Sequence, residues 1–410
     1  MVSSIAGLTH TRDHSASPEV PKGRGPVVLQ VVPRLDTGGV ERGTLEMVEA
    51  VVAAGGRALV ASAGGTLAGR VARLGGTLYP MNLASKNPFT LWQNAGLLAR
   101  LVREEGVAVI HARSRAPAWS AWLAAQRTGV AFITTYHGVY RENLPLKRAY
   151  NAVMARGRPT IAVSTYVRDL VALRHGLAAE HLITIPRGAD LRVFSEDAVG
   201  DARTVGLAEA WGLVDDPRPV VMLAGRLSHW KGQAVLIEAA AALARQGIEA
   251  LFLIVGDGRE RYRRALEARI SALALEASVR LVGGCQDMAA AYKLASVAVS
   301  ASTEPEAFGR VAIEAQAMAR PVIATDHGGA RETVAPGETG WLVPPGDADA
   351  LAAALAEALA LSPEARQRIG AAGRARVEGA FSLERMQQAT LAVYAQATGQ
   401  RFPGLPALDT

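Results

Sequence analysis

The stretch VAVSASTEPEAFGRVAIEAQAMARPVIAT, residues 297–325, contains one complete structural unit. A short β-branched run at 297–301 is followed by a polar loop and then by an Ala-rich segment with helical spacing up to Met318. A second β-branched run, PVIAT, begins at Pro321. Short apolar strands that alternate with longer helices are typical of βαβ units in a parallel sheet. The stretch therefore predicts an α/β fold.

The same alternation extends in both directions along the chain. We predict strands at 27–32, 57–62, 77–81, 108–112, 131–136, 160–164, 182–186, 220–224, 250–255, 279–283, 297–301, 321–325 and 340–344. Residues 195–217 interrupt this rhythm with Asp, Gly and Pro, and we interpret them as the connection between two domains. The sequence thus predicts two Rossmann-like doubly wound domains in tandem. The carboxyl ends of both sheets are expected to face one central cleft, where ligands bind.

The predicted boundaries divide the chain into four parts. These are a flexible tail at 1–25, an N-terminal domain at 26–200, a C-terminal domain at 201–380, and a final helix and tail at 381–410. A chain of 410 residues is too long for one ordinary core, which agrees with two domains. No run of about 18 apolar residues predicts a membrane-spanning helix. Because Cys285 is the only cysteine, no internal disulfide is possible and a cytoplasmic location is expected.

Charge is distributed unevenly between the two halves. Residues 1–200 carry 23 Lys and Arg against 14 Asp and Glu, so the remaining 210 residues carry 44 − 23 = 21 against 38 − 14 = 24. Nucleic acid is not the expected partner, because aromatic residues make up only 5% and no block of Lys and Arg is present. The basic half favours an anionic lipid surface or a phosphorylated acceptor, and a merely solvated basic face stays equally open.

Two glutamates flank the predicted start of the helix in the quoted stretch. The amides around Phe308 and Gly309 begin this helix, which makes an anion site suited to a pyrophosphate. Glu306 precedes the helix, which is predicted from Ala307 onward, and Glu314 lies eight residues further on. A carboxylate accepts two hydrogen bonds, so each glutamate suits a vicinal diol of a ribose or a hexose. The alternative is that both are ordinary surface charges of a helix.

The loop GRLSHWKG, residues 225–232, follows a predicted strand and has Gly at both ends. Arg226 and Lys231 lie five residues apart in it, so both can reach one dianion, Arg as a fork and Lys as a point charge. Basic pairs in loops are usually solvated, and this motif by itself leaves that alternative open.

The first strand and a strand in the middle of the N-terminal domain are each followed by a further candidate. In RLDTGGVER, residues 34–42, Gly38 and Gly39 permit a turn that approaches a ligand closely; a plain strand–helix turn is the alternative. His137, in TTYHGVY, is placed at the carboxyl end of the sheet and facing the cleft. The alternative there is a structural loop histidine.

No metal site is expected. The eight histidines lack metal-ligand spacing. Asp347 and Asp349 form an Asp-x-Asp, but they open an Ala/Leu-rich segment, where Asp is the usual N-cap or first-turn residue. His111 ends a strand and is a minor candidate for the acceptor side of the cleft.

Together these motifs resemble those of the family 4 retaining glycosyltransferases. The segment EPEAFGRVAIEAQAMARPVIATDHGG, residues 304–329, resembles the Glu-x7-Glu motif of that family. Residues 225–232 resemble its Gly-Arg-Leu-x-x-x-Lys-Gly signature, and residues 34–42 its Gly-Gly-x-Glu loop. The resemblance extends from about Gly38 to Trp341, which is most of the chain.

The resemblance implies a role for each of these residues. It implies that Glu306 contacts the donor hexose and that Glu314 contacts the nucleotide ribose. It assigns Arg226 and Lys231 to the donor diphosphate, where they stabilise the leaving nucleotide. His137 is expected to donate to a hexose hydroxyl, and the glycine pair of the first loop faces the phosphates from the opposite domain.

The resemblance also implies the GT-B architecture, with a final helix near 382–396 that crosses back onto the first domain. It implies a retaining hexosyltransferase that takes its sugar from a nucleotide-diphosphate donor and needs neither a cofactor nor a metal ion. The expected acceptor is a cell-envelope glycan or glycolipid, such as the lipopolysaccharide core. A nucleotide-sugar epimerase or hydrolase, a GT-B phosphorylase and a non-catalytic nucleotide-sugar-binding protein stay open as alternatives.

A basic segment suggests a membrane contact. Residues 141–158, RENLPLKRAYNAVMARGR, carry five cations against one acid. The apolar residues interleaved with them, and those on a second helix upstream, are Leu144, Leu146, Tyr150, Val153, Met154, Phe89 and Trp92. A basic face with apolar side chains can rest on an anionic leaflet, so peripheral binding to the inner face of the cell membrane is predicted. The alternative is that the apolar residues pack on the sheet.

Overall fold

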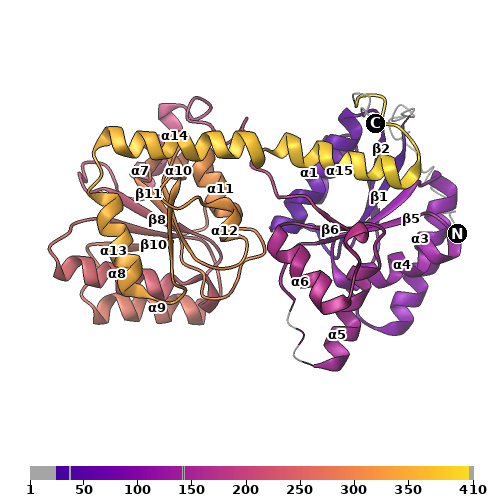
Figure 1. Cartoon of the computed structure of the whole chain (residues 1–410), viewed down its shortest axis with the longest axis horizontal. Helices are drawn as coiled ribbons and strands as arrows, with labels where there is room; N and C mark the ends of the chain where they lie inside the picture. The colour runs from indigo at the N-terminus through magenta and orange to yellow at the C-terminus, as the bar shows by residue number, and fades with distance from the viewer. Residues whose placement is uncertain (1–24, 37, 141, 143, 406–410) are drawn as a thin grey trace, which may run out of the picture.

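The computed structural model describes residues 25–36, 38–140, 142 and 144–405, and it has two parallel sheets, each covered by helices (Figure 1). The predicted tail lies almost wholly outside the described residues. The first sheet has the strand order β3-β2-β1-β4-β5-β6-β7, and every pair in it is parallel. Its strands are β1 (Val27–Val31), β2 (Arg57–Ser62), β3 (Thr77–Pro80), β4 (Val109–Ala112), β5 (Ala131–Tyr136), β6 (Thr160–Ala162) and β7 (Leu182–Thr184).

Helices cover both faces of this sheet, which is why its strands are apolar on both sides. They are α1 (Gly39–Ala53), α2 (Ala68–Arg73), α3 (Pro88–Glu105), α4 (Arg115–Thr128), α5 (Pro145–Asn151) and α6 (Thr165–His175), with 3-10 turns η1 (Ala152–Arg156) and η2 (Ala179–His181). The helix α3 begins where the Asn87 side chain accepts from the amide of Phe89 at 2.9 Å. Residues 145–156 form an α-helix followed directly by a 3-10 turn.

The second sheet has the order β10-β9-β8-β11-β12-β13 and is also parallel throughout. Its strands are β8 (Val220–Ala224), β9 (Leu251–Val255), β10 (Val279–Gly283), β11 (Val297–Ser300), β12 (Val322–Thr325) and β13 (Gly340–Val343). The helices of this domain are α7 (Asp201–Ala210), α8 (Gln233–Arg245), α9 (Glu260–Ala272), α10 (Met288–Leu294), α11 (Arg310–Ala317), α12 (Ala330–Thr333), α13 (Ala348–Leu359) and α14 (Pro363–Ala380), with the 3-10 turn η3 (His229–Lys231). The strand order reverses between β1 and β4 and again between β8 and β11, and ligands bind at such switch points.

The last helix, α15 (Leu383–Thr398), leaves the second domain and packs on the first (Figure 1). Its residues Leu391 and Tyr394 are buried in the core around β1. The Tyr394 hydroxyl lies 2.6 Å from Nδ1 of His111, and Thr135 lies 2.7 Å from the other ring nitrogen. The crossover helix is confirmed. The assignment of His111 to the acceptor side is wrong, because both ring nitrogens are used inside the core.

Both doubly wound domains are confirmed, and most strands begin and end within one or two residues of their predicted bounds. The start of one helix is wrong. The helix α11 begins at Arg310 and not at Ala307, because Gly309 has a φ of 95°, in the left-handed region, and is the N-cap. Among the described residues, no helix is both long and apolar enough to cross a membrane.

Candidate active site

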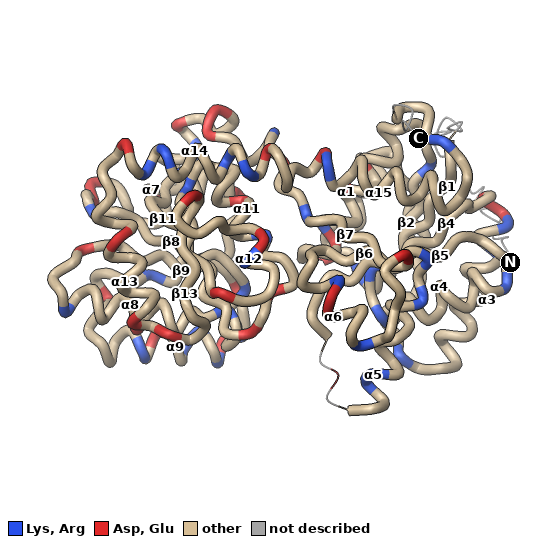
Figure 2. The backbone as a smooth tube through the Cα atoms, in the orientation of Figure 1, with Lys and Arg blue, Asp and Glu red and all other residues tan. Residues whose placement is uncertain are grey.

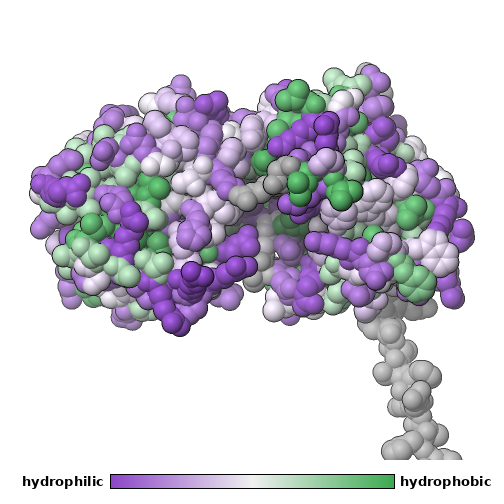
Figure 3. Space-filling model, turned by 90° about the horizontal axis from the view of Figure 1, so that it is seen from below, coloured by the Kyte–Doolittle hydropathy of each residue, from purple (hydrophilic) through white to green (hydrophobic). Residues whose placement is uncertain are grey.

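A cleft of about 780 Å³ lies between the two domains, beyond the carboxyl ends of the central strands. Seen from below, the molecule is hollowed between its two halves (Figure 3). The candidate residues that line the cleft are Gly39, His137, Arg226, Lys231, Glu306, Phe308 and Gly309. Trp230 and Arg310 line it as well. The structure therefore brings together most of the candidates that the sequence placed on separate loops.

Lys231 and Glu306 form an ion pair in the cleft. The Lys231 ammonium donates to Oε1 of Glu306 at 2.7 Å, and the Ser302 hydroxyl donates to the same oxygen. Burial by itself would raise the pKa of Glu306, but the Lys231 charge and these hydrogen bonds outweigh it, so the pKa lies below its usual 4.5. Among the described residues, Oε2 of Glu306 receives no hydrogen bond. A charged carboxylate oxygen is therefore available to accept from a ligand hydroxyl.

Arg226 stands beside this pair as an exposed cation. Its carbonyl oxygen is held by the Gln233 side chain at 3.1 Å, so the backbone of the loop is anchored. Within the described part of the chain, the guanidinium of Arg226 has no ion-pair partner. An anchored backbone with an unpaired guanidinium at the cleft wall can bind an anionic ligand without first breaking a contact.

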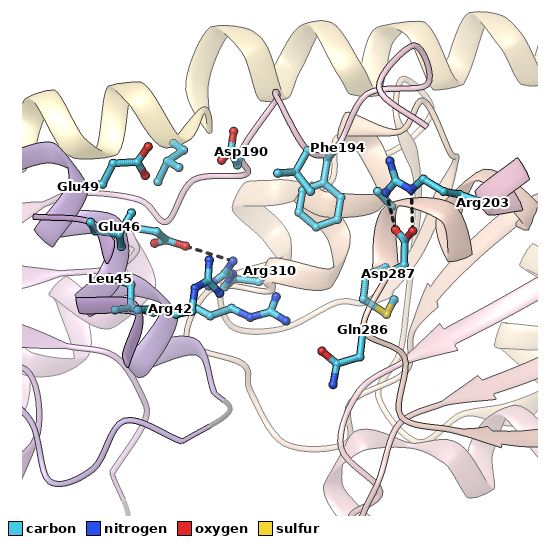
Figure 4. Close-up of a pocket in the computed structure, with 16 residues that line it drawn as sticks. Arg42, Leu45, Glu46, Glu49, Asp190, Phe194, Arg203, Gln286, Asp287 and Arg310 are labelled. Carbon is cyan, nitrogen blue, oxygen red and sulfur yellow. Dashed lines mark hydrogen bonds and ion pairs between the residues drawn. The ribbon is translucent and has the colours of Figure 1, made fainter. Parts of the chain in front are cut away.

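Glu314, on α11, does not line the cleft itself and is only 6% exposed. The Arg310 guanidinium bridges it to the opposite domain: it lies 3.1 Å from Glu314 and 3.5 Å from Glu46 of α1. Arg310 also lines a second cavity of about 440 Å³, together with Arg42 and Gln286 (Figure 4). Glu314 lines neither cavity, and the Arg310 side chain, which lines both, lies between them and Glu314.

The glycine loop of the first domain is held by Arg187, which follows β7 of the same domain. Gly38 is the N-cap of α1 and has an extended backbone, and Gly39 is the first residue of the helix. Arg187 donates to the Gly39 carbonyl at 3.2 Å and to Glu46 at 3.0 Å. Burial lowers the pKa of Arg187 to about 10, which leaves it charged at neutral pH. Glu46 therefore accepts a hydrogen bond from Arg187 of its own domain and faces Arg310 of the second domain.

Neither Glu46 nor Arg310 is among the residues for which the sequence predicts a role. Each is an ordinary helix residue in the sequence, and nothing in the local pattern distinguishes it. The two meet only because α1 and α11 start at the facing edges of different sheets. Phe308 is a different case: its ring is buried against Phe381, so this residue presents only backbone to the cleft.

The two domains are also tied at the floor of the cleft. The Ser164 hydroxyl caps α6, accepting from the Val167 amide at 3.0 Å, and donates to the Ala307 carbonyl at 2.5 Å. The carboxylate of Glu332 accepts from the amide of Thr165 at 2.9 Å. Both contacts run from the first turn of α6 to the second domain, so they hold the loop that carries Glu306 against the first domain.

His137 follows β5, and its Nε2 is buried without a hydrogen-bond partner among the described residues. Desolvation and then the nearby Arg113 charge hold the pKa of His137 well below its usual 6.5. The side chain is therefore neutral at pH 7. A neutral imidazole that lines a cleft can donate one hydrogen bond to a sugar hydroxyl or accept one from it.

We expect no ionisation of His137 in the activity profile between about pH 8 and pH 6. Because its pKa is depressed, protonation would occur only at lower pH, and kcat/KM should stay level through this interval. His137→Gln keeps one donor and one acceptor and should retain more activity than His137→Ala at every pH. An inflection near pH 6.5 in the wild type that disappears in His137→Gln would contradict the neutral assignment.

Asp347 is the N-cap of α13 and accepts from the Ala350 amide at 2.9 Å. The cap interpretation of the Asp-x-Asp is confirmed. In the part of the chain that the structure describes, no group of three or more His, Cys, Asp or Glu side chains comes together in a metal-ligating arrangement.

Two family descriptions match the chain, one for each domain. Residues 37–193 match "Glycosyltransferase Family 4" and residues 210–376 match "Glycosyl transferases group 1". The chain therefore belongs to the family 4 glycosyltransferases and is a glycosyltransferase of the GT-B type.

Known relatives agree with this assignment. The chain is 32% identical over 294 residues to a GDP-mannose-dependent alpha-(1-6)-phosphatidylinositol monomannoside mannosyltransferase of Mycolicibacterium smegmatis, covering 68% of this chain and 74% of the relative. It is 32% identical over 340 residues to a D-inositol 3-phosphate glycosyltransferase of Xylanimonas cellulosilytica, covering 75% and 76%. A crystal structure of a glycosyltransferase from Rickettsia africae superposes with a TM-score of 0.84 at 34% identity, covering 91% and 99%.

Proposed function

We propose that this glycosyltransferase moves a hexose from a nucleotide-diphosphate sugar to a cell-envelope glycan or glycolipid, with retention of the anomeric configuration. The observation that carries the proposal is the charge arrangement in the cleft. Arg226 and Lys231 face the Gly39 loop across it, and a charged oxygen of Glu306 lies beside them. Two cations and backbone amides suit a diphosphate, and the carboxylate suits the hydroxyls of the attached sugar.

In this proposal the donor lies along the two cavities. The diphosphate binds Arg226 and Lys231, and the hexose lies between His137 and Glu306. The nucleoside extends past Arg310 toward the second cavity, where Glu314 accepts from the ribose.

The proposed reaction needs no nucleophile from the enzyme. The bond between the anomeric carbon and the phosphate oxygen breaks, and the acceptor oxygen bonds to that carbon on the same face. The acceptor proton passes to the departing phosphate oxygen, whose charge the two cations stabilise. The names of the two curated relatives, which act on phosphatidylinositol mannoside and inositol phosphate, support a phosphorylated or lipid-linked acceptor.

The donor is tested by thermal shift with a panel that includes GDP-mannose, UDP-glucose and ADP-glucose. One nucleotide-sugar should raise the melting temperature and release its nucleoside diphosphate on incubation. Proton NMR of the product should show the anomeric configuration of the donor. An inverted product would contradict retention. Binding without nucleotide release or transfer would favour the non-catalytic sensor, and conversion of the donor sugar itself would favour an epimerase.

Metal removal should leave activity intact. If Arg226, Lys231 and the amides supply the positive charge at the diphosphate, EDTA should not change the rate of nucleotide release. Turnover before and after dialysis against EDTA checks this. A complete loss that Mg²⁺ or Mn²⁺ restores would require a metal ion at the donor phosphates.

A peripheral contact with an anionic membrane is the proposed route to a lipid-linked acceptor. Only some of the side chains of the predicted membrane face are exposed. Val153 and Met154 are fully buried and Tyr150 is partly buried, so this part of the predicted membrane face is wrong: these side chains pack inward. Leu144 and Leu146 remain exposed, the latter at 85%, and the chain around α5 carries Lys and Arg (Figure 2). Phe89 and Trp92 are also exposed, at 63% and 60%.

Liposome co-sedimentation tests this contact. Binding should increase with the content of anionic lipid, decrease with salt, and weaken severalfold in Leu146→Asp, because a charge replaces an apolar side chain at the surface. Val205→Asp makes the same charge change on α7 of the other domain, where Val205 is 52% exposed, and should leave binding unchanged. Equal recovery on neutral and anionic vesicles at low salt would favour a soluble acceptor.

A further inference from the structure

The second domain also contains a groove that is distinct from the two cavities described above and adjoins the candidate site. It has a volume of about 1080 Å³ and is formed by the loops after β8 and β9 and the first turn of α9. Arg226, Trp230 and Glu304 line both this groove and the central cleft, so the two are continuous. Neither the candidate donor site nor the crossover helix uses the remaining residues of the groove.

The groove contains cations at an electrostatically unfavourable position. Arg259 is the N-cap of α9 and Arg261 lies in its first turn, and both are exposed. The amino end of a helix carries partial positive charge, so two arginines there destabilise the helix unless an anion is bound. Neither guanidinium has an ion-pair or hydrogen-bond partner in the described part of the chain, although the Arg259 carbonyl accepts from the amides of Tyr262 and Arg263. By contrast, Arg264 on the same helix pairs with Glu260 at 3.0 Å.

Aromatic side chains lie next to these cations. His229 packs on Tyr262 with ring centroids 4.2 Å apart, and Trp230 lies one residue further along the loop. Tyr262 is 9% exposed, and its hydroxyl is buried without a hydrogen-bond partner among the described residues. A buried hydroxyl without a partner costs free energy unless a ligand or water satisfies it. Aromatic rings beside unpaired arginines suit a sugar ring that carries a phosphate or a carboxylate.

We infer that this groove is an acceptor subsite for an anionic sugar, with the anionic group on Arg259 and Arg261 and the ring against Trp230 and His229. The inference rests on the proposed function, because the shared wall of Arg226 and Trp230 would place the rest of the acceptor toward the reacting hexose. It assigns part of acceptor recognition to the same domain as the donor.

Isothermal titration calorimetry with glucose 6-phosphate, glucose and inorganic phosphate tests the subsite. Glucose 6-phosphate should bind the wild type more tightly than either glucose or phosphate. Arg259→Glu and Arg261→Glu should each weaken it at least about tenfold, because a repulsive charge replaces a charge-assisted hydrogen bond. Arg264→Glu, with the same change of net charge on the same helix, should bind it like the wild type.

The affinity for the nucleoside diphosphate of the donor, measured on the same variants, separates the sources of the signal. It should not change in Arg259→Glu or Arg261→Glu, and melting temperatures should stay within the range of Arg264→Glu. If these variants bind the nucleoside diphosphate more weakly by the same factor as glucose 6-phosphate, the inference is overturned and the groove belongs to the donor site. If phosphate binds as tightly as glucose 6-phosphate, the groove is a simple anion site, and this result would also overturn the inference. If glucose 6-phosphate binds through these arginines but no nucleotide-sugar binds, the groove is an anionic-sugar site, and its assignment to the acceptor fails together with the proposed function.

Discussion

Arg226→Ala is expected to lower turnover by at least about tenfold while the free energy of unfolding stays unchanged. A charged hydrogen bond to the diphosphate contributes about 1.5–3 kcal/mol, which is about 10- to 150-fold in rate. Stability should not change because the guanidinium is exposed and has no ion-pair partner in the described chain. Arg226→Lys keeps the charge but loses the fork, so its rate should lie in between.

Steady-state nucleotide release and denaturant unfolding check this pair of outcomes. Arg245→Ala, an exposed arginine at the end of α8, is the matched control and should behave like the wild type. Wild-type turnover in Arg226→Ala would remove Arg226 from the site.

Lys231→Ala should lose a similar amount of turnover but also roughly 1–3 kcal/mol of stability, because it leaves the Glu306 carboxylate partly buried without its cation. The pKa of Glu306 is depressed, so this stabilisation is complete above its usual 4.5 and is lost as the pH falls through the lower folded-state value. The double variant Lys231→Ala/Glu306→Gln should recover stability but not turnover. If the recovered stability also restored turnover, Lys231 would act only through folding.

Replacement of Glu306 and replacement of Glu314 are expected to weaken the binding of different ligands. Glu314→Ala should weaken the free nucleoside diphosphate and the nucleotide-sugar alike, each about tenfold, because the proposed partner of Glu314 is the ribose. Glu306→Ala should weaken the nucleotide-sugar and leave the diphosphate nearly untouched, because the proposed partner of Glu306 is the hexose. Calorimetry with both ligands separates the two variants.

Glu338→Ala, an exposed glutamate of the same domain, controls for the loss of one negative charge and should bind both ligands normally. Glu314 has a further partner, Arg310, which also faces Glu46 of the first domain. Glu314→Ala removes the 3.1 Å ion pair of Arg310 and leaves it only Glu46 at 3.5 Å, so some stability should be lost as well, and denaturant unfolding of the same variant separates that loss from the loss of binding. The reverse order of the two glutamates would show that the hexose and ribose ends of the donor are exchanged.

The local pattern of the chain determined the elements and their order. β5, for example, begins and ends at its predicted residues, because a β-branched run bounded by turn residues defines its own ends. The loops that carry Arg226, Lys231, Glu306 and Gly39 were also predictable, since each follows a strand directly and parallel strands end at one edge of their sheet. What the strand pattern leaves unspecified is how side chains on different loops pair.

Those pairings depend on segments that are far apart in the sequence. The 2.7 Å contact between Lys231 and Glu306 joins the loops after β8 and β11, which are neighbours in one sheet but about 75 residues apart in the chain. The bridge from Arg310 to Glu46 exists only once the two sheets face each other. Burial is equally non-local. Val153 and Met154 have helical spacing suited to a surface face, yet they pack inward, and His111 binds a tyrosine that comes from the last helix of the chain. The sequence by itself therefore determined the two doubly wound domains and the candidate residues. The folded arrangement of the domains determined which charges are paired and which remain free to bind a ligand, because desolvation and ion pairing act between atoms that are close in space, whatever their separation along the chain.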